Sequence, residues 1–101
     1  MTAVILKLVI DEGVFAAVSD SLLVFETTPI EFNTLSIRSY SNEHQLEGIK
    51  EQVAGYLGKV QIEIRTTQEA YKDILNFLKV NHPKLESDYW VVPVLDSGRL
   101  S

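Results

Sequence analysis

The chain has 101 residues, 46% of them hydrophobic and 23% charged, a balance typical of a folded globular domain and not of a disordered one. The formal net charge of -5 argues against a nucleic-acid partner, because phosphate binding requires clustered Lys and Arg, and the absence of cysteine excludes disulfides and thiolate metal sites. We predict a single domain over residues 1–101, located in the cytoplasm because the sequence shows neither a membrane-inserting segment nor a secretory signal.

The N-terminal part predicts a strand followed by a helix. Residues 4–10 are apolar except for Lys7 and rich in β-branched side chains, as in a central strand buried on most of both faces. Asp11 is placed to cap the helix that follows, which ends before Thr28-Pro29 because the residue preceding a proline avoids helical geometry. The predicted apolar side of this helix comprises Val14, Phe15, Val18, Leu22 and Phe25.

Residues 31–40 have a two-residue period and predict a second strand, with Leu35 and Ile37 on one side and Thr34, Ser36 and Arg38 on the other. Residues 41–58 are polar at first and then apolar at helical spacing, and they contain three glycines. We predict a long connection with a short amphipathic helix inside it. Long ordered connections in compact domains are often functional.

A third strand and a second helix follow. Val60, Ile62 and Ile64 alternate with Gln61, Glu63 and Arg65, which predicts a strand with one apolar face and one polar face. Thr66 and Glu69 have the spacing of a capping box, which opens the helix. Its apolar side comprises Ala70, Tyr71, Ile74, Leu75 and Leu78. Asn81-His82-Pro83 ends it, and we interpret His82 as a residue that complements the helix dipole rather than as a metal ligand.

The last predicted strand runs from Tyr89 to Leu95 and contains no charged residue, so we expect both of its faces to be covered. Pro93 has no amide hydrogen, which places this strand at a sheet edge or at a bulge. An apolar edge of this kind favours association with a neighbouring chain.

This order of elements predicts an α+β, ferredoxin-like βαββαβ sandwich, in which a four-stranded antiparallel sheet carries two helices on one face. The other face would then carry Gln61, Glu63 and Arg65 beside apolar residues of the outer strands. An apolar patch of this size is unusual on a monomer, so we predict that copies of the chain bury it between them.

Three stretches carry a family resemblance: Glu51-Gln52-Val53-Ala54-Gly55, the alternating strand after it, and Tyr89-Trp90-Val91-Val92-Pro93-Val94 with Ser97-Gly98-Arg99-Leu100. They resemble an uncharacterised bacterial family of small proteins similar to the nitrogen-regulatory PII proteins and to the CutA divalent-cation tolerance proteins. The resemblance implies a homotrimer with its sheets turned inward and ligand clefts between subunits. Residues 40–58 would be the loop that contacts partners, and residues 81–88 the turn that flanks the cleft. It also links the chain to heavy-metal efflux systems, and so to a membrane transporter or another protein as its partner.

The turn at residues 81–88 departs from the PII pattern. It contains no glycine that would let backbone amides close on a phosphate, which argues against nucleotide as the ligand.

A candidate metal site lies in the long connection. Glu43, His44 and Glu47, with Glu51 further along, offer an imidazole and carboxylates for a divalent metal ion, and on a helix His44, Glu47 and Glu51 would share one face. A solvated acidic loop is the simpler interpretation of the same residues, because one histidine with carboxylates is a weak metal signature.

Arg38, Lys59 and Arg99, together with Arg65, are the basic residues nearest to the expected clefts, and we select the first three as candidate ligand-binding residues. Salt bridges between subunits, to Glu63 or Asp96, explain them at least as well. Tyr89 and Trp90 could form an aromatic wall for a ligand, but aromatic residues on such a strand are usually core or interface.

No nucleophile elbow, Walker loop, dinucleotide fingerprint or ordered catalytic triad is present in the sequence, so we do not predict an enzyme. The leading hypothesis is a PII-like regulatory homotrimer that binds a small ligand or a metal ion and then contacts a protein partner. The alternative is a CutA-like protein that binds a divalent cation without a signalling role.

Overall fold

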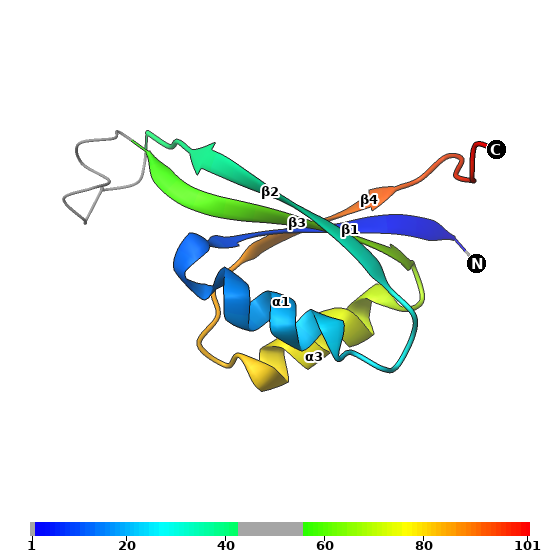
Figure 1. The fold of residues 1–101 in the computed structure, drawn as a ribbon, viewed down its shortest axis with the longest axis horizontal. Coiled ribbons are helices and arrows are strands. Elements are labelled where there is room, and N and C mark those ends of the chain that lie inside the picture. The colour runs from blue at the N-terminus through cyan, green and yellow to red at the C-terminus, as the bar shows by residue number, and fades with distance from the viewer. Residues whose placement is uncertain (1, 43–55) are drawn as a thin grey trace.

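The computed structural model describes residues 2–42 and 56–101. The elements follow in the order β1 (Ala3–Asp11), the 3-10 helix η1 (Glu12–Val14), α1 (Phe15–Leu23), β2 (Glu31–Ser39), β3 (Leu57–Thr67), α3 (Tyr71–Asn81) and β4 (Asp88–Pro93). The strands form a four-stranded sheet in the order β2-β3-β1-β4, and each neighbouring pair is antiparallel. In the described part of the chain, α1 and α3 lie on the same face of this sheet (Figure 1). The predicted ferredoxin-like fold is therefore confirmed.

The core lies between the sheet and the two helices. Val4, Leu6, Leu8 and Ile10 of β1 are buried on the helix side, and β3 adds Val60, Ile62 and Ile64 beside them. Val18 and Leu22 of α1, with Ile74 and Leu78 of α3, close the core from the other side. Alternation in the two central strands produces this arrangement, because successive side chains of a strand point to opposite faces.

The first helix differs from its prediction. β1 continues to Asp11, which is in register with Lys59, and the Asp11 carboxylate accepts a hydrogen bond from Lys59 Nζ at 2.7 Å instead of capping a helix. Because the strand ladder holds Asp11, the chain turns through η1 first, and α1 begins only at Phe15 and ends at Leu23. Val14, predicted in the core, is 41% exposed, whereas Phe25 is buried beyond the end of the helix, with its ring centroid 5.1 Å from that of Phe77.

The capping box predicted at Thr66 and Glu69 is wrong by one residue. β3 continues to Thr67, which is in register with Ala3, so Thr66 is still part of the ladder. The hydroxyl of Thr67 accepts a hydrogen bond from the amide of Ala70 at 3.2 Å. Hydrogen bonds from its own backbone amide, and to a lesser extent from the backbone of Thr2 and the Thr67 side chain, lower the pKa of the Glu69 carboxyl despite an opposing desolvation effect.

β4 occupies one edge of the sheet, as Pro93 predicted. Its predicted burial on both faces is wrong for a single chain, because Tyr89 and Trp90 are each 52% exposed. The helices lie over the two central strands, and of the β4 side chains Val91 packs against the core. Neither helix of residues 2–42 and 56–101 has the length and apolar character that a bilayer span requires.

Candidate functional site

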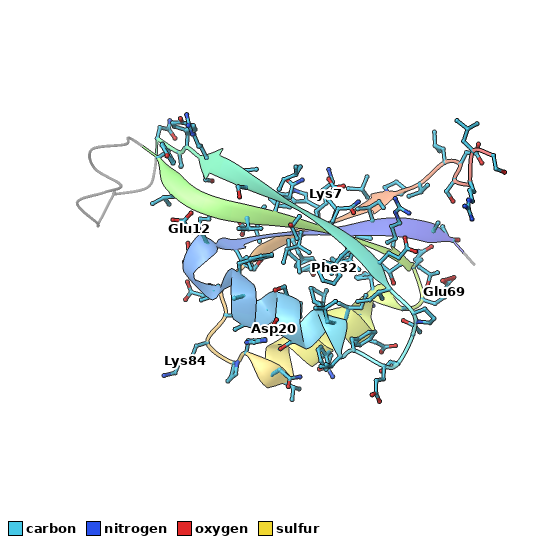
Figure 2. The ribbon with its side chains drawn as sticks, in the orientation of Figure 1. Lys7, Glu12, Asp20, Phe32, Glu69 and Lys84 are labelled. Atoms are coloured by element: carbon cyan, nitrogen blue, oxygen red, sulfur yellow. The ribbon has the colours of Figure 1, made fainter. Side chains whose placement is uncertain are left out.

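The sheet face turned away from the helices is called the bare face below. By strand register it carries Lys7, Glu63 and Gln61 at its centre. Lys7 Nζ lies 3.5 Å from Glu63 Oε1, and the Gln61 amide donates a hydrogen bond to the same oxygen at 3.0 Å. Figure 2 shows Lys7 on this face, whereas Phe32 lies between the sheet and the helices. The predicted location of Gln61 and Glu63 on the uncovered face is confirmed.

Apolar side chains lie on both sides of this polar centre, on the outer strands β2 and β4. They include Trp90 beside Lys7 and Leu35 beside Gln61, which are 52% and 58% exposed. The same registers place Ala3, Ile5, Val9, Ile37, Leu57 and Val92 on the bare face as well. At the rim, Arg65 pairs with Glu31 of the same chain at 3.1 Å. The bare face therefore combines exposed apolar side chains with a hydrogen-bonded polar centre, which is the reverse of the usual interface, in which an apolar centre lies inside a polar rim.

A cavity of about 540 Å³ lies beside Ser39, the last residue of β2, and Lys59 of β3, and we call it the sheet-end cleft. Its walls come from Val9, Ser39 and Lys59 on the strands and from residues 85–88 of the turn after α3. The Ser87 hydroxyl ties this turn to the sheet by donating a hydrogen bond to the Val9 carbonyl at 3.0 Å. The cleft thus brings Lys59, a predicted ligand residue, next to the turn.

Carboxylates dominate the charge around this cleft. Glu86 and Asp88 line it, and the Asp11 carboxylate forms an ion pair with Lys59, with 2.7 Å between Oδ1 and Nζ. Within one chain, this excess of negative charge does not favour a polyphosphate ligand, because its phosphate groups would be repelled by the nearby carboxylates. A cation or an anion of low charge suits the cleft better.

The other two predicted ligand residues do not join Lys59 in one chain. Arg38 is in register with Gly58, one step away from Lys59, so the two side chains leave the sheet on opposite faces. The Arg38 guanidinium lies over the Tyr56 ring at 5.0 Å, and the Tyr56 and Tyr40 ring centroids are 5.9 Å apart. Arg99 belongs to the C-terminal tail at the opposite end of the sheet (Figure 1).

On the same face as Arg38, the Glu12 carboxylate lies close to the backbone of Gly58. A Cβ atom on Gly58 would lie 2.7 Å from the Glu12 carboxylate, so glycine leaves room for this side chain.

The predicted metal residues Glu43, His44 and Glu47 lie outside the described residues. Within residues 2–42 and 56–101, no three His, Cys, Asp or Glu side chains are grouped as metal ligands. His82, the C-cap residue of α3, has its Nε2 2.8 Å from the Ser21 hydroxyl and so links the two helices.

Sequence reasoning named the turn but not the residues by which it forms the cleft. Ser87 and Asp88 carry no pattern that separates them from other turn residues, and Ser39 is an ordinary strand-end serine. Only the pairing of all four strands brings them together, because β3 joins β2 to β1 and β1 pairs with β4.

Over residues 1–101 the sequence matches a family model described as Protein of unknown function (DUF3240). The chain belongs to the DUF3240 family. Its structure is similar to that of a DUF3240 family protein from Shewanella baltica OS155, with a TM-score of 0.78 and 21% identity over 100% of this chain and 99% of that chain. Among curated proteins there is no match.

Two further structures similar to the DUF3240 chain are those of a PII-like protein and of a PII protein. CPII, a nitrogen regulatory PII-like protein from Thiomonas intermedia K12 bound to ADP, AMP and bicarbonate, has a TM-score of 0.67 and 7% identity over 99% of this chain and 98% of that chain. Arabidopsis thaliana PII bound to citrate has a TM-score of 0.63 and 14% identity over 92% of this chain and 78% of that chain. At these identities the likeness establishes a shared fold, and the predicted resemblance to an uncharacterised PII-like family is confirmed.

Proposed function

We propose that this DUF3240 protein is a non-enzymatic, PII-like regulatory protein that acts as a homotrimer in the cytoplasm. The bare face is the observation that carries the proposal. Trp90 and Leu35 keep more than half of their surface exposed on the same side of the sheet, around the polar centre at Lys7 and Glu63. Large exposed apolar side chains gathered on one face of a sheet are typical of interfaces, and a polar pair inside an interface can specify the register of the partners.

In this proposal the sheet-end cleft binds a small ligand or a metal ion. Lys59 lines the cleft, and its ammonium would leave Asp11 to meet an anion, whereas a cation would instead be met by Glu86 and Asp88. Arabidopsis thaliana PII is bound to citrate in its structure, and the PII-like protein CPII is bound to ADP, AMP and bicarbonate. Arg99, at the far end of its own chain, would contribute to the cleft only from a neighbouring copy.

Signalling would pass from the cleft to residues 40–58. Tyr40 begins this segment and Tyr56 lies near its end, and Ser39 and Lys59, which flank the segment directly, line the cleft. A ligand held by Lys59 would therefore change the surface offered to a partner, in our proposal a membrane transporter of a metal-efflux system or another protein.

A thermal-shift panel tests the ligand part of the proposal, with citrate, ADP, Zn²⁺, Cu²⁺ and Ni²⁺ added to the wild type. A ligand present at about ten times its Kd stabilises the native state by about 1.4 kcal/mol, which raises Tm by about 6 °C in a domain of this size. For an anion, we expect Lys59→Gln to remove this shift and Lys84→Gln to retain it, because Lys84 is exposed on the same turn but outside the cleft. An anion-induced shift that survives Lys59→Gln would contradict the assignment of Lys59.

The CutA-like alternative depends on Glu43, His44 and Glu47, and so on a part of the chain outside the described residues. Calorimetric titration of Cu²⁺, Zn²⁺ and Ni²⁺ into wild type and His44→Ala separates the two functions. Binding heat that disappears in His44→Ala would favour a metal site in this segment, and heat that is unchanged would exclude His44 as a ligand.

A further inference from the structure

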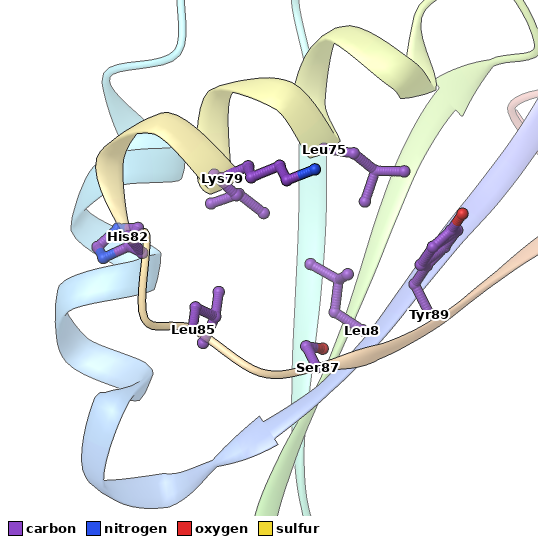
Figure 3. Close-up of a pocket in the computed structure, with 8 residues that line it drawn as sticks. Leu8, Leu75, Lys79, His82, Leu85, Ser87 and Tyr89 are labelled. Atoms are coloured by element: carbon purple, nitrogen blue, oxygen red, sulfur yellow. The ribbon is translucent and has the colours of Figure 1, made fainter.

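A second cavity lies on the helix side of the sheet, between α3 and β4, and we call it the helix-side pocket (Figure 3). Its volume is about 330 Å³, at the lower end of the range for small-molecule sites. The pocket exists because α3 lies over the central strands and leaves the edge strand β4 partly uncovered, so that Tyr89 stands away from the helix. It is formed within one chain and is independent of the proposed trimer.

The interior of the pocket is apolar. Leu8 of β1 and Leu78 of α3 are buried, and Leu75 and Leu85 pack against the same core from the helix and from the turn. A ligand group placed here would contact four leucine side chains and lose its contact with water. The free energy of this transfer is favourable for an aliphatic or aromatic group and unfavourable for a charged one.

The polar groups around the mouth differ in their availability. The His82 ring is hydrogen-bonded to Ser21, and the Ser87 hydroxyl donates to the carbonyls of Val9 and Asp88. Lys79 is exposed, and across residues 2–42 and 56–101 its ammonium has no carboxylate within ion-pair distance. In Figure 3 its side chain extends along the mouth, with the ammonium end toward Leu75.

We propose that the helix-side pocket binds a small organic anion, with the carboxylate at Lys79 and an aliphatic or aromatic body on the leucines. Charge complementarity selects this class, because the only charged side chain lining the pocket, within the described residues, is that cation. The Tyr89 hydroxyl, on the opposite wall, is a second donor for the same carboxylate. This site goes beyond the proposed function, because Lys79, Leu75 and Leu78 do not line the sheet-end cleft, although Leu85 and Ser87 line both cavities.

Octanoate titrated into isotope-labelled protein, followed by amide chemical shifts, tests the proposal, with octanol as the neutral probe of equal length. We expect saturable shifts in residues 75–89 and an affinity about five-fold lower in Lys79→Gln, as for loss of one partly exposed ion pair. Lys72→Gln is the matched control, because Lys72 is an exposed lysine of the same helix that does not line the pocket. Both substitutions are on the surface, and thermal unfolding of each variant verifies that it is folded.

Three results would overturn the proposal. The first is the absence of saturable shifts up to about 10 mM octanoate, well above the concentrations at which weak specific ligands saturate. The second is octanol binding as tightly as octanoate, which would show that Lys79 does not select an anion. The third is an equal loss of affinity in Lys72→Gln and Lys79→Gln, which would indicate a general effect of net charge.

Discussion

Replacing Trp90 by glutamate tests whether the bare face is an interface. Trp90 is opposite Lys7 in the β1–β4 register, so a glutamate there faces a lysine across the strands, and the single chain keeps a favourable pair at this position. Between copies, the same change removes a large apolar surface and adds a charge. We therefore expect Trp90→Glu to remain folded and to lose the trimer.

The magnitude follows from the exposure of the indole. An aromatic side chain buries about 200 Å² when fully covered, and Trp90 is still 52% exposed in one chain. About 100 Å² of apolar surface therefore remains to be buried by a neighbour, worth about 2.5 kcal/mol per chain. Over the three chains of a trimer, losing about 7.5 kcal/mol lowers the association constant roughly 10⁵-fold.

Sedimentation velocity measures the assembly, and fluorescence provides a second readout, because Trp90 is the only tryptophan in the chain. We expect wild-type emission to shift to longer wavelength on dilution, as the trimer dissociates and the indole meets water. Tyr89→Glu is the matched control, since Tyr89 has the same 52% exposure on the same strand but points to the opposite face. Wild type that sediments as a monomer at micromolar concentration would refute the reasoning, and equal dissociation of both variants would assign the contact to the strand edge instead of the face.

Three further predictions concern the fold. Ile74→Ala removes a fully buried side chain between α3 and the sheet and should cost about 3 kcal/mol in urea unfolding; a cost below about 1 kcal/mol would contradict the core assignment. The pKa of the Glu69 carboxyl is lowered in the folded state, so its contribution to stability is present above the unfolded-state pKa and is lost as pH falls through the folded-state pKa. In Glu69→Gln, the free energy of unfolding should therefore fall less steeply at acid pH than in the wild type. An unchanged pH dependence would refute this. Ser21→Ala removes the hydrogen bond to His82 and should cost about 1 kcal/mol in thermal unfolding, whereas Ser19→Ala, whose hydroxyl bonds to a carbonyl of its own helix, should cost less.

Local patterns in the sequence determined the main elements of the fold. The alternation at Val60, Ile62 and Ile64 predicted a strand whose apolar side is buried, and the helical spacing of Ile74 and Leu78 predicted the second helix. Their order along the chain led to the ferredoxin-like topology, because right-handed crossovers leave few other arrangements. These predictions succeeded because burial of a periodic apolar face depends on neighbours in the sequence.

The tertiary structure alone decided how the elements end and which residues meet. Strand pairing of Asp11 with Lys59 makes the first helix begin later than its sequence predicted. Pairing of Thr67 with Ala3 likewise moves the residue that caps the second helix from Thr66 to Thr67. In both places, pairing between strands distant in the sequence outweighs a local capping preference. The same pairing set Arg38 and Lys59 on opposite faces, and the position of α3 opened the pocket beside Tyr89. No short-range pattern encodes these outcomes, since each depends on where a segment distant in the chain comes to lie.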